Sequence, residues 1–417
     1  MRKLVAVATV LVAALALTVP GALGGAEQTP GVTAKSIVIG GTFPLTGPVA
    51  SYAPISVGIK TYLSYINARK SAVDGKRGIY GRQVVFKIYD DGYNPANTIQ
   101  LTRRLVEQDK VFATVGQLGT EQNLAVRPYL NQRKVPHSLL STGASYWGTQ
   151  YKEFPWTIGW QQDYIAEGRL YGLHIKANQR GKKIAVLYQN DDYGKDYLYG
   201  LRAALGKTYA DANIAIQEAY EVTAPNVTSQ MAKIRATGAP ILVILATPPH
   251  SIRAYATGKA LGYNPEQVYL NSVAATAFWM NLTVGAAGAP YVNGSLSVTA
   301  LKDPADPTQA NDAAIREYKR LLEKYAPGTN PSNGLYLYGF GIGETFVQAM
   351  YKAGKNPTRA SYMNALLSLN NTNRFLLAGV RMKTSKTDHF IVSQMRLQRF
   401  KDGAWSPVGQ LVEGRPG

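Results

Sequence analysis

The sequence predicts an α/β protein made of two doubly wound units, each built on a parallel sheet. Short apolar runs alternate with helical patterns from residue 31 to residue 147, which is the first observation. The second is that this alternation stops at an extended segment, 154–160, and then restarts. Because a strand, a helix and another buried strand in succession form a parallel crossover, the restart indicates a second sheet. A chain of 417 residues with 46% hydrophobic content can fill two such cores.

The first unit rests on the stretch 111–147, which predicts strand, polar turn, helix, strand and polar turn in that order. Helical patterns end near residues 67 and 108, and a third covers 124–130. The strands of this unit are expected at residues 31–43, 84–89, 111–115 and 135–140.

The second unit repeats the alternation from residue 163 onward. Its helices are expected at 163–176 and 227–236, with two more ending near residues 205 and 261. Its strands are expected at residues 183–188, 213–220, 240–246 and 267–270. The remaining chain predicts strands at 291–298 and 390–400, helices at 311–325, 332–351 and 358–369, and a strand or loop at 405–412.

The N-terminus has the pattern of a secretory signal peptide. Arg2 and Lys3 precede an apolar run, 4–19, and small residues follow it. The alternative is a membrane anchor, but this run is shorter than a bilayer requires. We therefore expect residues 1–26 to be removed and the protein to be exported to a bacterial periplasm. The chain contains no Cys, so it forms no disulfide.

The chain is strongly basic, with a formal net charge of +19 that becomes +17 when Arg2 and Lys3 are removed with the leader. The basic residues occur as scattered pairs, such as Arg103-Arg104 and Lys182-Lys183, and form no block with interleaved aromatic residues. We therefore expect solvated surface charge and no nucleic-acid partner. The excess of positive charge gives mild support to an anionic small ligand.

Patterns for catalysis or for a metal are weak. The four His have no ligand-like spacing, and His250, which follows a strand end, is expected at the surface or in a loop. The glycines of 339–343 form GxGxG inside a helical pattern, which favours close helix packing over a dinucleotide site. The pairs Asp90-Asp91 and Asp191-Asp192 more often cap helices or fix loops than act as acid and base. We expect no enzyme activity, cofactor or metal.

Two polar turns, 116–120 and 141–145, follow neighbouring strands of the first unit. The carboxyl ends of parallel strands are where open sheets bind ligands, and free N–H groups and hydroxyls there suit a carboxylate. The alternative is that these residues only cap helices. Aromatic residues recur at strand ends and loops in both units, and they suit closure over a small organic ligand. They are Tyr52, Tyr93, Tyr146, Tyr164, Tyr193, Trp147 and Trp160.

Several stretches together resemble a known family. They include IVIGGTFPLTGPVASYAP (37–54), GRQVVFKIYDDGYNP (81–95), VGQLGTEQN (115–123), LLSTGAS (139–145), IAVLYQNDDYGKDYLYGL (184–201) and QVYLNSVA (267–274). The chain resembles the periplasmic solute-binding proteins of branched-chain amino acid type ABC importers, which have the type I periplasmic-binding fold. The resemblance implies two lobes joined by three hinge segments, a ligand enclosed on closure, and delivery to a membrane ABC permease. We expect a monomer, with lobe 1 at 27–158 and 294–385 and lobe 2 at 159–293 and 386–417.

The resemblance also assigns a ligand site. Residues of the first-lobe turns would hold the ligand carboxylate, Tyr52 would cover it, and residues of the second lobe would close over it. The first-lobe turn residues are Thr120, Ser141, Thr142, Ala144 and Ser145, and the second-lobe residues are Tyr193, Thr247 and Asn271.

The turn after residue 270 departs from the family pattern. Amino-acid binders of the family carry an acid in this turn, which pairs with the ligand ammonium, but here the turn reads NSVA (271–274). An ammonium without a partner in a closed cleft is costly, although Asp191 or Glu121 could substitute. A carboxylate without an amino group, aromatic or not, is therefore expected. The alternatives are an amino acid, an amide or urea, and a ligand-sensing receptor of the same fold.

Overall fold

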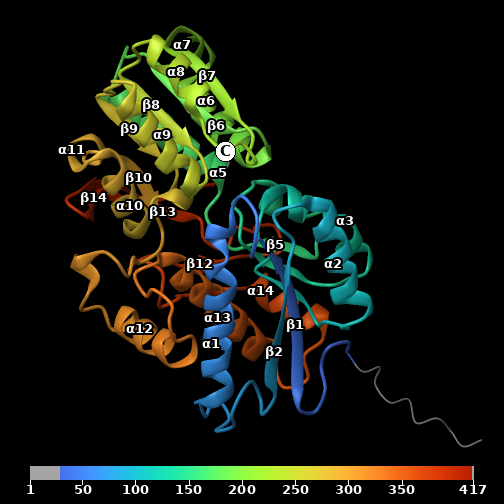
Figure 1. Ribbon diagram of the computed structural model, residues 1–417. Coiled ribbons are helices and arrows are strands. Elements are labelled where there is room, and N and C mark those ends of the chain that lie inside the picture. The colour runs from blue at the N-terminus through green and yellow to red at the C-terminus, as the bar shows by residue number, and fades with distance from the viewer. Residues whose placement is uncertain (1–28, 416–417) are drawn as a thin grey trace, which may run out of the picture.

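The chain folds into two doubly wound lobes, and the computed structural model describes residues 29–415 (Figure 1). The first lobe is built on a five-stranded parallel sheet in the order β2-β1-β3-β4-β5. Its strands are β1 (Ser36–Phe43), β2 (Gln83–Asp90), β3 (Thr114–Val115), β4 (His137–Leu140) and β5 (Thr157–Gly159). The predicted signal peptide, 1–26, lies outside the described residues.

Helices cover both faces of the first sheet, with α2 and α3 on one side and α1, α12 and α13 on the other (Figure 1). A short hairpin of β11 (Asn370–Asn371) and β12 (Met382–Lys383) follows them. The helices are η1 (Ala50–Tyr52), α1 (Pro54–Ala68), α2 (Pro95–Glu107), α3 (Thr120–Gln132), α4 (Tyr146–Thr149), η3 (Pro307–Gln309), α12 (Ala313–Tyr325), α13 (Gly334–Ala353) and α14 (Arg359–Leu366).

The second lobe contains a seven-stranded sheet in the order β14-β13-β10-β9-β8-β6-β7. Strands β7 to β10 run parallel to β6. At one edge β13 pairs antiparallel with β10, and β14 pairs antiparallel with β13. The strands are β6 (Ile184–Gln189), β7 (Ile214–Tyr220), β8 (Ile241–Leu245), β9 (Gln267–Leu270), β10 (Leu296–Thr299), β13 (Gln394–Lys401) and β14 (Ala404–Glu413).

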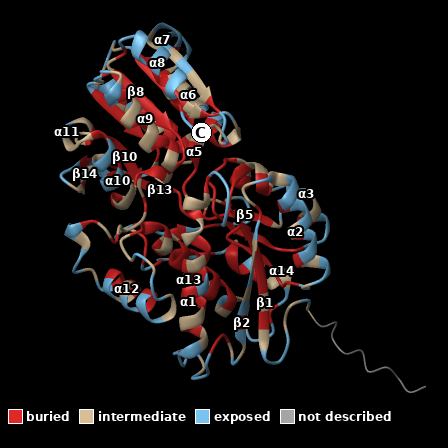
Figure 2. Cartoon of the chain, viewed as in Figure 1, coloured by how far each residue is buried: buried red, intermediate tan, exposed pale blue. Residues whose placement is uncertain are grey.

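Two separate hydrophobic clusters line the faces of this second sheet. Figure 2 shows that the buried residues of both lobes concentrate along the sheets and along α13. The helices of the second lobe are α5 (Tyr164–Asn178), α6 (Asp192–Leu205), α7 (Lys207–Asn213), α8 (Thr228–Ala236), α9 (Pro248–Ala260), η2 (Ser272–Ala274), α10 (Ala277–Ala287) and α11 (Ala289–Val292).

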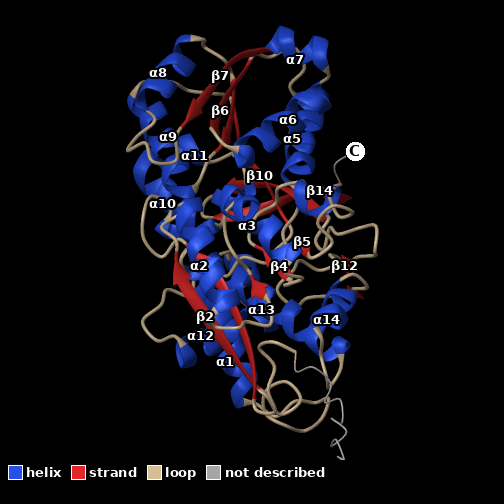
Figure 3. Ribbon diagram, turned by 90° about the vertical axis from the view of Figure 1, so that its right-hand side faces the viewer, coloured by secondary structure: helices blue, strands red, loops and turns tan. Residues whose placement is uncertain are grey.

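The chain passes between the lobes three times: between β5 and α5, between β10 and α12, and between β12 and β13. Seen from the side, the lobes lie one above the other, with β5 and β10 near the middle of the molecule (Figure 3). The predicted two-lobed α/β fold with three connecting segments is therefore confirmed.

One predicted assignment differs from the strand pairing. The sequence places residue 294 onward in the first lobe, but β10 pairs with β9 and with β13 in the second sheet. Leu296 and Val298 are buried in a second-lobe hydrophobic cluster, which explains why the strand stays there. The chain therefore leaves the second sheet after Thr299. The predicted strand 291–298 also begins too early, because Ala289–Val292 is helical.

The glycines of 339–343 serve helix packing, as predicted. A Cβ on Gly339 would lie 2.3 Å from the carbonyl oxygen of Ile55 in α1. A Cβ on Gly341 would lie 2.6 Å from the ring of Trp160, and one on Gly343 would lie 2.9 Å from the ring of Tyr62. Helix α13 can approach its neighbours this closely because these positions carry no side chain.

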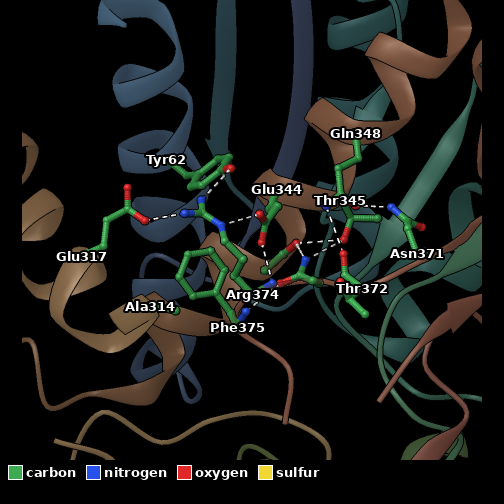
Figure 4. A network of polar contacts seen from close by, with 12 residues as sticks. Tyr62, Ala314, Glu317, Glu344, Thr345, Gln348, Asn371, Thr372, Arg374 and Phe375 are labelled. Carbon is green, nitrogen blue, oxygen red and sulfur yellow. Dashed lines mark hydrogen bonds and ion pairs between the residues drawn. The ribbon is translucent and has the colours of Figure 1, made fainter. Parts of the chain in front are cut away.

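A charged network fixes the helices of the first lobe to one another (Figure 4). The guanidinium of Arg374 forms ion pairs with Glu344 of α13, at 2.7 Å, and with Glu317 of α12. The hydroxyl of Tyr62, on α1, lies 3.4 Å from the same guanidinium. Burial lowers the pKa of Arg374, but its neighbours Glu344, Tyr62 and Glu317 together outweigh burial and raise this pKa above its ordinary value. The network thus joins α1, α12 and α13.

Candidate ligand-binding site

A cavity lies between the two lobes and encloses about 1060 Å³, part of it open to solvent. The first lobe contributes the ends of β3 and β4 and the start of α3, and the second contributes the segments that follow β6, β8 and β9.

Six of the nine predicted site residues line this cavity. They are Tyr52, Thr120, Ser141, Thr142, Tyr193 and Thr247. The other three, Ala144, Ser145 and Asn271, lie behind the wall or between the lobes. Tyr93 and Tyr164, which the sequence marks as strand-end aromatic residues, also face the cavity.

The first-lobe edge of the cavity presents hydrogen-bond donors. Helix α3 begins at Thr120, beside the cavity, and no side chain caps it. The N–H groups of its first turn therefore have no side-chain acceptor. The preceding Gly119 has φ of 100°, and a Cβ there would lie 2.0 Å from the side-chain oxygen of Gln122. The hydroxyls of Thr120 and Thr142 lie 2.7 Å apart, so only one of their two protons is used in this contact. Such an edge suits an anion.

Ser141 contributes differently from its two neighbours. Its hydroxyl donates to the carbonyl oxygen of Gly116 at 2.9 Å, so the proton is already engaged. Although the residue lines the cavity, its hydroxyl presents lone pairs there.

In the second lobe, His250 determines which way the hydroxyl of Thr247 points. Nε2 of His250 lies 2.9 Å from the carbonyl oxygen of Ala224, which can only accept, so Nε2 carries the proton. Burial lowers the pKa of His250, and the ring is therefore neutral. Nδ1 then accepts from the hydroxyl of Thr247 at 2.9 Å. Thr247 thus presents an acceptor to the cavity. His250 is buried in α9, so its predicted position at the surface or in a loop is wrong.

Asn271 holds Tyr193 in place. Its Nδ2 donates to the hydroxyl of Tyr193 at 2.5 Å and to the carbonyl oxygen of Ala246 at 3.0 Å. The hydroxyl of Tyr193 accepts this bond, so its own proton is free to donate to a ligand. The ring of Tyr193 also packs edge-on against Tyr164, with centroids 5.2 Å apart.

The turn after β9 contacts a buried carboxylate, but this carboxylate is fully engaged. Glu167 accepts from the N–H and the hydroxyl of Ser272, at 2.7 and 2.6 Å, and from the hydroxyls of Tyr171 and Tyr197, at 2.6 and 3.0 Å. Burial raises the pKa of Glu167 to about 7, although these bonds partly offset the effect. A carboxylate can accept about four hydrogen bonds, and Glu167 already accepts four. It therefore has no free acceptor position for a ligand ammonium.

Hydrogen bonds join the lobes directly beside the cavity. The Glu121 carboxylate of α3 accepts from the N–H of Asp192, at 3.0 Å. The N–H of Ser145 donates to Asp196 at 3.0 Å, and the Ser145 hydroxyl donates to Asp163. Ser145 therefore connects the lobes, while Ala144 packs with Leu140 and Trp147.

The aspartate pairs have structural roles. Asp90 accepts from the N–H groups of Leu45 and Thr46, and Asp191 caps α6 by accepting from Gly194 at 3.1 Å. Within residues 29–415, no group of His, Asp or Glu is placed to hold a metal ion.

The sequence gives little sign of several lining residues. Tyr338 of α13 reaches the cavity and donates to the side-chain oxygen of Gln161 at 2.8 Å. Trp405 of β14 and Leu301, between β10 and α12, also line it. These residues lie far along the chain from the polar turns, so no local pattern connects them to the site. The position of Gln161 and Gln162, directly after the extended segment 154–160, is the one available signal.

A cavity enclosed between two doubly wound lobes that the chain connects three times defines a two-lobed ligand-binding protein. Residues 36–404 match the family model for periplasmic binding proteins, and the chain belongs to this family. It is of the branched-chain amino acid type. The family has a substrate-binding, non-enzymatic fold. No helix within the described part of the chain is long and apolar enough to cross a membrane.

Among relatives, an amino acid binding protein of Pseudomonas aeruginosa is 22% identical over 326 residues, or 78% of this chain and 81% of that protein. The Leu/Ile/Val-binding protein homolog 3 of Brucella melitensis is 27% identical over 41% of this chain and 44% of that protein.

Solved structures share the fold. A branched-chain amino acid ABC transporter protein of Thermus thermophilus with bound valine has a TM-score of 0.77 at 17% identity, covering 92% of this chain and 98% of that one. A fatty acid ABC transporter substrate-binding protein of Thermomonospora curvata has a TM-score of 0.75 at 19% identity, covering 93% and 95%.

Proposed function

We propose that this protein is the periplasmic substrate-binding component of an ABC importer, and that it captures a small organic carboxylate without an α-amino group. The ligand contacts both lobes, so it stabilises their closed arrangement over an open one. A monomer then presents the closed form to a membrane permease. The two solved structures described above are named as ABC transporter proteins, which supports this role.

The saturated carboxylate of Glu167 is the observation that carries the choice of ligand. The turn after β9 offers Ser272 and Val273 to the cavity, and the acid behind it already accepts four hydrogen bonds. A ligand ammonium enclosed there would be left without a charged partner, which is unfavourable. A ligand carboxylate, by contrast, meets the uncapped start of α3 and the hydroxyls of Thr120 and Thr142.

An α-amino acid is the second candidate, because the relatives are named for amino acids. Two aspartates, Asp303 and Asp306, also line the cavity. Each already accepts hydrogen bonds within the protein: Asp303 from the N–H groups of Ala277 and Ala305, and Asp306 from Thr308. We rank this candidate second because the turn after β9 carries no acid of its own.

Matched ligand pairs test the proposal. Leucine is compared with 4-methylpentanoate, and phenylalanine with 3-phenylpropanoate, by thermal shift and titration calorimetry. Within each pair we expect the acid without the amino group to bind more tightly. Stabilisation by the amino acids alone would exclude the proposed ligand class.

The variant Thr120→Val tests where the carboxylate lies. Loss of a hydrogen bond to a charged group is expected to weaken binding by about 1.5–3 kcal/mol, or roughly 10- to 150-fold. The control is Thr283→Val, which removes a buried hydroxyl of α10 that donates to the carbonyl oxygen of Trp279, away from the cavity. Equal affinity in the two variants would place the anion elsewhere.

A further inference from the structure

The cavity extends well beyond the predicted carboxylate site. Along the second sheet its lining runs from Tyr193, after β6, past Thr247, after β8, to Val298 of β10 and Trp405 of β14. The sheet order from the first to the last of these residues is β6-β8-β9-β10-β13-β14, which contains five steps between adjacent strands. Because adjacent strands lie about 4.8 Å apart, the strands that line the cavity span on the order of 20 Å across the sheet. A single amino acid would occupy only one end of the cavity.

The far part of the cavity has an apolar wall, beside which Thr276, Thr299, Gln309 and Gln398 also line the cavity. We call this part the hinge-side chamber, and its apolar wall consists of Val273, Ala275, Val298, Leu301, Leu335 and Trp405. It lies where the chain leaves β10 for α12, beside the start of α13. A Cβ on Gly334, at that start, would lie 3.1 Å from Thr276 of the second lobe, so both lobes enclose the chamber.

The charged residues of this chamber already make contacts within the protein. Nζ of Lys302 lies 2.7 Å from Asp312, and the carboxylate of Asp303 accepts from the N–H of Ala277 at 2.6 Å. A ligand carboxylate placed there would lose water and lie beside Asp303 and Asp306, which carry the same sign of charge. An apolar group would gain the free energy of burial against the wall.

We propose that the hinge-side chamber binds an extended apolar body, and that the ligand is an amphiphilic carboxylate such as a medium-chain or aryl-substituted monocarboxylate. This inference rests on the proposed function, because the carboxylate at α3 fixes the end from which the apolar body extends. A saturated chain advances about 1.3 Å per bond. About 8 to 12 carbons therefore reach from the polar end into the chamber.

A homologous series of straight-chain monocarboxylates tests the chamber. Butanoate, hexanoate, octanoate and decanoate are titrated calorimetrically against the chain without residues 1–26. Each added methylene is expected to lower Kd about three- to fourfold, the effect of burying one CH₂ group, until the chamber is full. A Kd that is independent of length, or that rises beyond hexanoate, would overturn the chamber as a binding site.

The variant Val273→Trp fills the chamber from the partly buried turn after β9. It is expected to weaken decanoate binding at least tenfold and to leave butanoate within about twofold. Leu301→Trp, from the opposite wall, is the second variant should the first fold poorly. The control Val73→Trp adds the same ring at a position that is 60% exposed and does not line the cavity.

The outcomes separate this inference from the proposed function. If butanoate and decanoate bind equally well and both chamber variants weaken them equally, the chamber proposal is wrong while the carboxylate site stands. If no member of the series binds while leucine or valine does, the proposed ligand class is wrong and the chamber proposal is overturned with it.

Discussion

At the scale of single residues, the hydroxyl groups that line the cavity are oriented by side chains behind them that do not line the cavity themselves. His250 fixes the hydroxyl of Thr247, and Asn271 fixes that of Tyr193. Each supporting residue determines whether the residue in front of it donates or accepts. On the second lobe, Thr247 therefore offers an acceptor and Tyr193 a donor. Whether each hydroxyl donates or accepts depends on a second residue elsewhere in the chain. It therefore cannot be predicted from Thr247 or Tyr193 alone.

The role of Asn271 can be tested with a double-mutant cycle. Because Asn271 acts through Tyr193, the variants Asn271→Leu and Tyr193→Phe should each weaken ligand binding by about 1 kcal/mol, and the double variant by little more than one of them. Titration calorimetry of all four proteins provides the measurement. Additive losses would instead mean that Asn271 contacts the ligand directly.

At the scale of elements, much of the fold follows from local patterns. The stretch 111–147 predicts strand, turn, helix, strand and turn, and the structure places β3, α3 and β4 there. Most strands of the second unit agree to within a residue or two. Strand β8, for example, is a continuous apolar run between turns. The polar turns also identify Thr120, Ser141 and Thr142, since parallel strands bring their carboxyl ends to one edge.

Other elements could not be assigned in this way. Strand β10 has four residues, and nothing within so short a run specifies which sheet it joins. Helix α10 reads AFWMNLTVGAA, whose apolar residues surround the helix, so no amphipathic period marks it. Tyr338 and Trp405 reach the cavity only because α13 and β14 pack beside it. Their placement depends on tertiary contacts across hundreds of residues.

The contact between α1 and α13 allows a direct test of glycine packing. In Gly339→Ala the new Cβ would lie 2.3 Å from the backbone oxygen of Ile55, and since backbone cannot move aside cheaply we expect a loss of about 1–3 kcal/mol of folding free energy. The matched control is Gly285→Ala in α10, where a Cβ meets no atom within 4 Å. That variant should gain about 0.5–1 kcal/mol from helix propensity. Urea unfolding measures both, and changes of the same sign would contradict the packing argument.

At the scale of the whole molecule, carboxylates gather where the lobes meet. Asp196 of the second lobe accepts from the N–H of Ser145 in the first, with Asp163, Asp191 and Asp192 around it. Burial raises the pKa of Asp196 to about 7, and the neighbouring carboxylates add to this effect. Burial likewise raises the pKa values of Asp163 and Asp191 to about 6. Ionisation of Asp196 therefore opposes the lobe arrangement that the structure adopts.

This carboxylate predicts a pH-dependent difference between the wild-type protein and Asp196→Asn. The folded pKa of Asp196 is about 7 and its unfolded pKa is about 3.8, so its favourable contribution is complete below about pH 4 and is lost as the pH rises through 7. The asparagine variant should match wild type near pH 4.5 and exceed it by about 1–3 kcal/mol at pH 8.

Comparing wild type with Asp196→Asn removes the contribution of the histidines to the pH dependence of stability. Burial lowers the pKa values of His137, His174, His250 and His389, and these groups destabilise the folded protein as the pH falls below about 6.5. Both proteins carry the same four histidines, so their contribution cancels in the difference. Asp74→Asn, which removes the same charge from a turn remote from the lobe contact, controls for net charge. The measurement is the difference in unfolding free energy between wild type and Asp196→Asn. If this difference is the same at pH 4.5 and at pH 8, the Asp196 carboxylate does not oppose closure.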